Sequence, residues 1–204
     1  MSTNNGFRVE KDFLGSNEIP EGAYWGIHSL RAAENFPITG TQVSRWPGFI
    51  KAIAQVKKAA AIVNLEFGVI SKEQSEAIIK ACDDVAAGKL NNEFIVDVIQ
   101  GGAGTSTNMN ANEVIANRGH VLTGGTLNDE QKVLNPNDDV NKSQSSNDTY
   151  PTAMHIAAYK MAVEVTLPGL QHLRTVLQQK VVEFKDIVKT GRTHFMDATP
   201  LTLG

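Results

Sequence analysis

Hydrophobic side chains recur at helical spacing along much of the chain after residue 48. The first row steps by three or four residues and consists of Ile53, Val56, Ala60, Val63 and Phe67. It predicts a helix that starts near Phe49, with Gly68 at the position of a C-cap. Ser71 and Gln74 have the spacing of a capping box, which predicts a second helix reaching Gly88. Its apolar row includes Cys82, so we expect a buried, unreactive thiol.

Two more helices follow in the second half of the chain. One is expected from about Ser106 to Val121, and the other from Thr149 to about Val188. Pro168 should kink or interrupt the latter helix, because proline lacks an N–H donor. Residues 124–145 have no sustained apolar period, so a long ordered loop is predicted between these helices.

The first 48 residues are interrupted repeatedly by glycine and proline. This composition predicts an extended arm with turns, and a weak strand signal lies around Phe7–Val9. The whole pattern indicates a mainly α fold with a domain boundary near residue 144. We therefore expect an N-terminal domain over residues 1–143 and a second domain that begins at residue 144 and continues to residue 204.

Composition narrows the class of protein. The 204 residues include 19 Lys and Arg against 22 Asp and Glu, so no basic surplus favours nucleic acid. No apolar stretch approaches a membrane span, and a single cysteine suits a reducing compartment. We expect a soluble, cytoplasmic chain without nucleic-acid or membrane partners. Its last residues, GRTHFMDATPLTLG, lack a polar tail or helix cap, which is typical of a fragment of a longer protein.

Three polar segments are not explained by a hydrophobic core. The first is Gly101–Asn110, where small residues precede Thr105, Ser106 and Thr107 at the start of a predicted helix. Exposed N–H groups and the helix dipole make such a terminus suitable for an anion. The alternative is a glycine-rich turn with ordinary Ser or Thr N-caps. The spacing matches neither a dinucleotide fingerprint nor a Walker loop.

The second polar segment is Asn135–Thr149, which runs directly into an apolar helix. Ser145, Ser146 and Asn147 would offer neutral donors beside the positive end of that helix. The alternative is a solvated loop that ends in Asp148 or Thr149 as a plain N-cap.

The third polar segment is Gly191–Asp197, expected at the end of the long helix. His194 could act there as an acid, a base or a donor near neutral pH. The alternative is a histidine that only interacts favourably with the helix dipole.

Together these segments carry many neutral donors, one histidine and few charges. Such a set suits a small dicarboxylate, because proton removal next to a carboxylate creates further negative charge that donors must stabilise. No metal-binding motif and no G-x-S-x-G elbow offers a different chemistry.

At these segments the sequence closely resembles the aspartase/fumarase superfamily, over essentially its whole length. Two stretches, Ala23–Arg31 with Glu34–Phe36 and Gly101–Ser106 with Asn108–Asn110, are more similar to the aspartase branch than to fumarases. The segments Asn135–Thr149 and Gly191–Gly204 are shared by both branches. Phe195 and Met196 replace the usual Leu-Gln after the histidine.

The resemblance implies a small N-terminal helical domain followed by the start of a long-helix bundle, which assembles a homotetramer with active sites where three subunits meet. It implies anti elimination of ammonia from L-aspartate to give fumarate, without an organic cofactor or a metal. A fumarase, another lyase of the superfamily, or a non-catalytic helical scaffold are the alternatives.

Residues are assigned to roles by the same resemblance. His194 is implied as a catalytic residue, and the substrate contacts are implied to be Thr105, Ser106, Thr107, Ser145, Ser146, Asn147 and Thr193. The family's serine base lies on a Gly-Ser-Ser-x-Met-Pro-Gly-Lys-x-Asn loop, and these 204 residues do not contain that loop. The chain is therefore expected to be somewhat less than half of such an enzyme.

Overall fold

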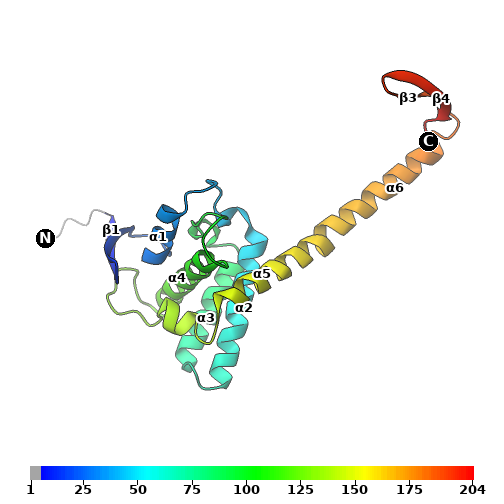
Figure 1. Ribbon diagram of the computed structural model, residues 1–204. Helices are drawn as coiled ribbons and strands as arrows, with labels where there is room; N and C mark the ends of the chain where they lie inside the picture. The colour runs from blue at the N-terminus through cyan, green and yellow to red at the C-terminus, as the bar shows by residue number, and fades with distance from the viewer. Residues whose placement is uncertain (1–5) are drawn as a thin grey trace. The chain divides into compact units, whose positions relative to one another are not determined.

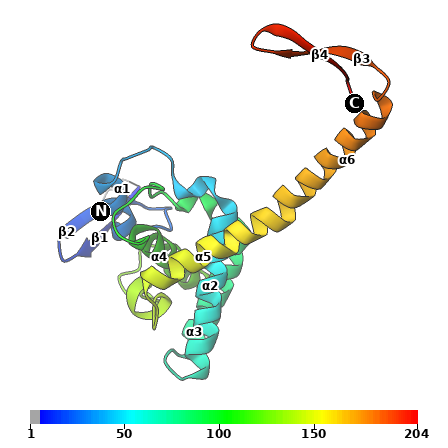
Figure 2. The ribbon, with the colours of Figure 1, turned by 45° about the vertical axis from the view of Figure 1, so that its right-hand side comes forward.

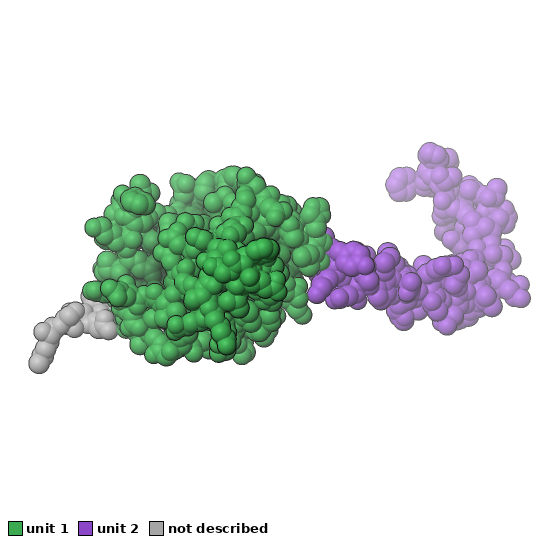
Figure 3. All heavy atoms as spheres, turned by 90° about the horizontal axis from the view of Figure 1, so that it is seen from below, with its two compact units in different colours: residues 1–157 green, residues 158–204 purple. Residues whose placement is uncertain are grey.

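The computed structural model describes residues 6–204, so the first five residues of the predicted arm lie outside the described residues. Contacts divide the chain into two compact units, Met1–Ala157 and Ala158–Gly204 (Figure 3). Residues 144–157 belong to the first unit, because Thr149 and Ala153 are buried in its core. The observed division therefore lies after the predicted boundary. Among the described residues, no helix is long and apolar enough to span a membrane.

Three helices build the core of the first unit, and all three were predicted. They are α2 (Pro47–Glu66), α3 (Lys72–Ala86) and α4 (Thr105–Leu122). Helices α2 and α3 lie side by side, and α4 packs against α3 (Figures 1 and 2). Their fully buried side chains include Ile50, Ile53, Ile78, Val85, Val114 and Ile115.

Local signals fix where these helices begin and end. The capping box of α3 is present: the Ser71 side chain accepts from the Gln74 N–H, and the Gln74 side chain accepts from the Ser71 N–H. Gly68 has a positive φ of 66° after α2, as its predicted C-cap position requires. Cys82 is buried as predicted, and burial raises the pKa of its thiol to about 12.

The buried face of α2 differs from the predicted apolar row. Val63 and Phe67 are 47% and 79% exposed, whereas Lys57 and Asn64 are buried. Both polar side chains find partners in the loop that follows α4: Lys57 Nζ donates to Asn141, and Asn64 donates to the Lys142 carbonyl. The helix is therefore rotated toward these hydrogen bonds, which a row of apolar positions does not reveal.

The predicted arm contains more regular structure than expected. Strands β1 (Phe7–Asp12) and β2 (Gly15–Pro20) form an antiparallel hairpin, which confirms the strand signal around Phe7. Helix α1 (Ile27–Asn35) and the short turn η1 (Val43–Arg45) follow. A second short turn, η2 (Asn91–Glu93), precedes α4.

Helix α1 owes its start to a distant carboxylate. Glu113 of α4 accepts hydrogen bonds from the backbone N–H groups of Gly26, His28 and Ser29 at 2.8–3.0 Å. The Glu113 carboxylate thereby replaces a local N-cap side chain, because Gly26, the N-cap residue of α1, has none. Gly26 must lack a side chain, because a Cβ there would lie 2.9 Å from Glu113 Oε1.

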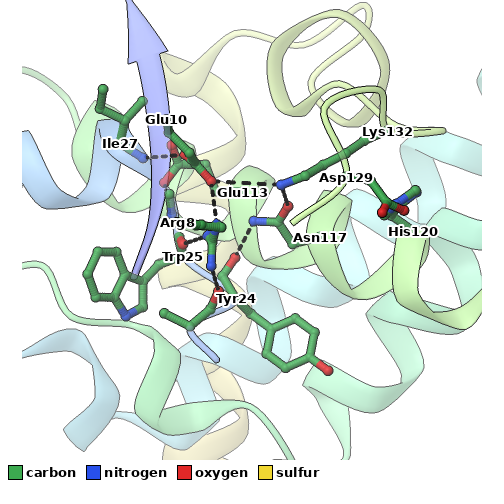
Figure 4. Close-up of polar contacts among 12 residues, drawn as sticks. Arg8, Glu10, Tyr24, Trp25, Ile27, Glu113, Asn117, His120, Asp129 and Lys132 are labelled. Carbon is green, nitrogen blue, oxygen red and sulfur yellow. Dashed lines mark hydrogen bonds and ion pairs between the residues drawn. The ribbon is translucent and has the colours of Figure 1, made fainter. Parts of the chain in front are cut away.

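Buried charged and amide side chains fasten the hairpin and the arm to α4 (Figure 4). Arg8 donates to the carbonyl groups of Ala23 and Trp25 at 2.7 and 2.8 Å. Lys132 donates to Asn117 of α4, and Asn117 donates to the Tyr24 carbonyl, both at 2.7 Å. Arg8 and Asn117 thus bond the backbone of residues 23–25, and Lys132 occupies the remaining amide oxygen of Asn117.

The long polar loop after α4 is ordered, as predicted, and includes a single π-helical turn, η3 (Pro136–Val140). The Asn135 side chain accepts from the N–H groups of Asn137 and Asp138 at its start. Val140 is buried against the core, which anchors the loop.

A long helical segment leads from the first unit into the second. It consists of α5 (Ser146–Met161), the π turn η4 (Ala162–Thr166) and α6 (Leu167–Glu183). The interruption immediately precedes Pro168 and confirms the effect expected of that proline.

The second unit ends in a β-hairpin, whereas the sequence predicted that the segment Gly191–Asp197 lies at the end of the long helix. Strands β3 (Val188–Thr193) and β4 (Met196–Thr202) are antiparallel, and the segment Gly191–Asp197 comprises the end of β3, the turn and the start of β4. The helix had already ended at Glu183. The prediction that placed His194 at a helix C-terminus is therefore wrong.

Candidate active site

The glycine loop before α4 brings the backbone close to an aromatic ring. Gly104 is the N-cap of α4 with a φ of 80°, and an added Cβ would lie 2.1 Å from Cγ of Tyr150. Because the N-cap residue is glycine, no Ser or Thr side chain caps this helix, and the N–H group of Thr107 in its first turn is bonded by the side chain of Gln100 instead. The alternative of ordinary Ser or Thr N-caps is therefore wrong, and capping does not occupy the hydroxyl groups of Thr105 and Ser106.

The three hydroxyl residues after this loop have different surroundings. Thr105 is exposed, Ser106 is half-buried and Thr107 is fully buried. Gln100 holds Thr107 from two sides, because its amide donates to Thr107 Oγ1 at 2.6 Å and accepts from the Thr107 N–H at 2.8 Å. The Thr107 hydroxyl thus secures the loop, while the other two face outward or partly outward.

The second predicted segment lies at the start of α5. The Ser145 hydroxyl accepts from the Asn147 N–H at 3.2 Å, and the helix begins at Ser146. Asp148 and Thr149 are therefore inside the helix, and their interpretation as a plain N-cap is wrong. Ser145 and Asn147 are exposed, and Ser146 is half-buried.

These two segments meet in space. Thr105 Oγ1 lies 3.3 Å from Ser146 Oγ, although 41 positions separate them in the chain. The same junction includes Tyr150 of α5 against Gly104. Two helix N-termini with neutral hydroxyl and amide donors are thereby brought together, an arrangement that favours an anion.

A buried hydrogen-bond network lies beneath this junction, and the apolar pattern gave no sign of it. The Asn141 Oδ1 atom accepts from Lys57 Nζ at 2.9 Å and from Asn108 Nδ2 at 3.0 Å. Thr149 Oγ1 lies 3.1 Å from both Asn108 Oδ1 and the Ser145 carbonyl, and its single hydrogen is shared between these two acceptors. Burial lowers the pKa of Lys57 to about 7. The usable signal was a lysine and an asparagine, Lys57 and Asn64, seven residues apart on one helix face.

The third predicted segment, Gly191–Asp197, lies entirely within the second unit. Thr193 pairs with Met196, so His194 and Phe195 form the two-residue turn between β3 and β4. Their φ angles are 52° and 59°, a left-handed conformation that is uncommon for such side chains. Thr193 and His194 are both exposed, and Arg192 pairs with Asp197 at 3.0 Å.

Comparison with known proteins identifies the class of molecule. The family described as Lyase matches residues 15–204. The chain belongs to this lyase family, which is the aspartase/fumarase superfamily that the motifs resemble. Its mainly α architecture agrees with that membership.

Relatives of both branches are similar to the chain. It is 54% identical to the class II fumarate hydratase of Pasteurella multocida over 97% of its own length. It is 50% identical to the aspartate ammonia-lyase of Escherichia coli K12 over 98% of its length. The chain spans about 42% of the length of both relatives.

Solved structures share the fold. A fumarate lyase:delta crystallin from Brucella melitensis superposes with a TM-score of 0.89 at 46% identity, over 97% of this chain and 45% of that one. The class II fumarase of Schistosoma mansoni gives a TM-score of 0.85 at 38% identity, over 97% of this chain and 41% of that one.

The glycine loop provides a structural prediction. Gly104→Ala should lower the free energy of unfolding by about 3 kcal/mol, because a left-handed alanine adds to a clash with Tyr150. Gly102→Ala is the matched control. Gly102 has a φ of 74°, but its added Cβ would lie 3.4 Å from Thr105 Oγ1, so about 1 kcal/mol is expected. Urea unfolding of both variants measures the difference, and equal losses would contradict the packing of Tyr150 on this loop.

Proposed function

We propose that the protein containing this chain eliminates ammonia from L-aspartate in the anti sense to give fumarate. The contact between Thr105 and Ser146 carries the proposal, because it brings neutral donors from two helix N-termini to one place. The relatives named as aspartate ammonia-lyases and fumarate hydratases support a C4 dicarboxylate as the substrate class.

Neutral donors suit the charge change of this reaction. Removing a proton from the carbon next to a carboxylate moves negative charge onto the carboxylate oxygens. Hydroxyl and amide donors that are already oriented stabilise that charge without reorganising. In this proposal the donors are Thr105, Ser106, Ser145, Ser146, Asn147 and Thr193, while Thr107 supports the loop through Gln100.

His194 is proposed as the catalytic residue of this chain, acting as a donor or acid/base group near neutral pH. Its exposed position in a tight turn leaves the imidazole accessible. The resemblance assigns proton abstraction to the serine loop, which lies outside these 204 residues. No metal or organic cofactor is part of the proposed reaction.

A fumarate hydratase is the second candidate function. The 54% identity to the Pasteurella multocida class II fumarate hydratase favours it. The stretches Ala23–Arg31 and Gly101–Ser106 favour the aspartase branch instead, through their resemblance. Both reactions give fumarate, and they differ in whether ammonia or water leaves.

A homotetramer in the cytoplasm completes the proposal. Helix α6 supports assembly, because its apolar side chains at Leu170, Leu173, Leu177 and Val181 are 49–56% exposed. Such a row normally packs against partner helices in a bundle.

An assay of the full-length protein tests the function directly. Fumarate formation should be faster from L-aspartate than from L-malate, measured by the absorbance of fumarate at matched substrate concentrations. The reverse preference would establish the fumarate hydratase, and no fumarate from either substrate would overturn the proposed elimination.

Thr105→Val in that protein should lower kcat/KM by about 10²-fold, because one oriented donor to the substrate is lost. Valine has nearly the shape of threonine, and Thr105 is exposed, so the melting temperature should stay close to that of the wild type. Kinetics with the preferred substrate, together with thermal unfolding, measure both effects. An unchanged kcat/KM would exclude Thr105 from the site.

His194→Asn separates catalysis from folding. Asparagine adopts a positive φ more readily than histidine, so the turn between β3 and β4 should be as stable or more stable. A large fall in kcat/KM without a fall in melting temperature is expected. Unchanged turnover would show that His194 takes no part in the reaction.

A further inference from the structure

The buried face of α2 carries a lysine without a carboxylate partner. Lys57 is 0% exposed, and no described carboxylate lies within 4.0 Å of its Nζ atom. Its one hydrogen bond among the described residues is to Asn141 Oδ1, at 2.9 Å. Cys82 of α3 is the titratable group that acts on the pKa of Lys57, and because burial raises the pKa of its thiol to about 12, it provides no negative counter-charge near neutral pH.

Such a lysine costs stability at this position. Charged groups are expensive to bury without an opposite charge, and an apolar side chain of similar volume often stabilises such a site. Its neighbours on the buried face of α2 include Ile53, Ala54 and Ala61. The hydrogen bond to Asn141 is therefore the contribution that an apolar residue could not make.

The side chain of Asn141 also bonds the backbone next to Ser145–Asn147, which is called the donor segment below. Its Nδ2 atom donates to the carbonyl of Gln144, the residue directly before Ser145. A parallel connection runs from Asn141 through Asn108 to Thr149, whose single hydroxyl hydrogen is shared between Asn108 Oδ1 and the Ser145 carbonyl. The carbonyl groups of two successive residues, Gln144 and Ser145, are thus bonded by the same network.

We propose that Lys57 is a positioning residue, which through Asn141 holds the donor segment Ser145–Asn147 in place beside Thr105. Its own ammonium group does not touch substrate, because it is fully buried beneath the junction of α4 and α5. The catalytic consequence rests on the proposed function, whereas the placement of the segment can be measured without any substrate.

Lys57→Met in the full-length protein tests the proposal, with Lys58→Met as the matched control. Lys58 is the next residue on α2, and it pairs on the surface with Asp83. In Lys57→Met, amide hydrogen exchange at residues 147–149 should accelerate by about tenfold, since their N–H groups bond to Ser145. In Lys58→Met the exchange at these residues should stay within about twofold of the wild type.

Activity and stability should change in opposite directions. A displaced donor segment should lower kcat/KM by about 10²-fold in Lys57→Met. Below pH 7 the wild-type lysine is charged in both the folded and the unfolded chain, so the burial cost is fully present. The melting temperature of Lys57→Met at pH 6 should therefore equal or exceed that of the wild type. A residue that serves stability alone would lose activity and stability together.

Asn141→Ala provides the second variant, because Asn141 is half-buried and lies in a loop. It should accelerate exchange at the same residues, and the double variant Lys57→Met/Asn141→Ala should add little to either single change. Additive effects, or unchanged exchange at residues 147–149 in Lys57→Met, would overturn the proposal. If exchange behaves as expected while neither L-aspartate nor L-malate gives fumarate, the positioning role stands and the proposed function fails.

Discussion

The side-chain amide of Asn141 is the interaction on which the candidate site depends. One oxygen accepts from α2 and α4, and one nitrogen donates to the backbone that leads into α5. Apolar contact between helices is non-directional, whereas a hydrogen bond weakens steeply outside a narrow geometry. The network therefore restricts the spacing between Thr105 and Ser146 in a way that apolar contact alone would not.

Hydrogen bonds between buried side chains and distant backbone groups also order the N-terminal arm. Glu113 binds the start of α1 from 84–87 positions away, and Asn117, one turn further along α4, reaches the Tyr24 carbonyl. Helix α4 thus holds the arm through its polar side chains, and its own first turn carries Thr105. Apolar packing in this unit supplies the bulk of the core, while buried polar groups determine which segments meet.

Elements with local sequence signals were predicted correctly, whereas elements that depend on distant polar contacts or unusual turn residues were missed. Local signals predicted α2, α3 and α4, the capping box at Ser71, and the interruption before Pro168. Helix α1 was missed because its cap comes from Glu113, far away in the chain. The hairpin of β3 and β4 was missed because its turn consists of His194 and Phe195, without the Gly or Asn that normally marks a positive φ.

The donor segments themselves could be read from the sequence, since runs of Ser, Thr and Asn beside glycine are visible without a structure. Their meeting could not, because it depends on Lys57 and Asn64 facing inward on a helix whose apolar row indicated another face.

A site built from neutral donors needs a buried hydrogen-bond network that fixes the positions of those donors. A charged residue attracts an anion over a distance of several ångströms, but a hydroxyl group contributes only when its position and direction are correct. Neither Thr105–Thr107 nor Ser145–Asn147 contains a cationic side chain, so what these two segments contribute to binding an anion depends on their orientation. The buried polar contacts cost stability in the core, but they restrict the backbone of the residues that carry the donors.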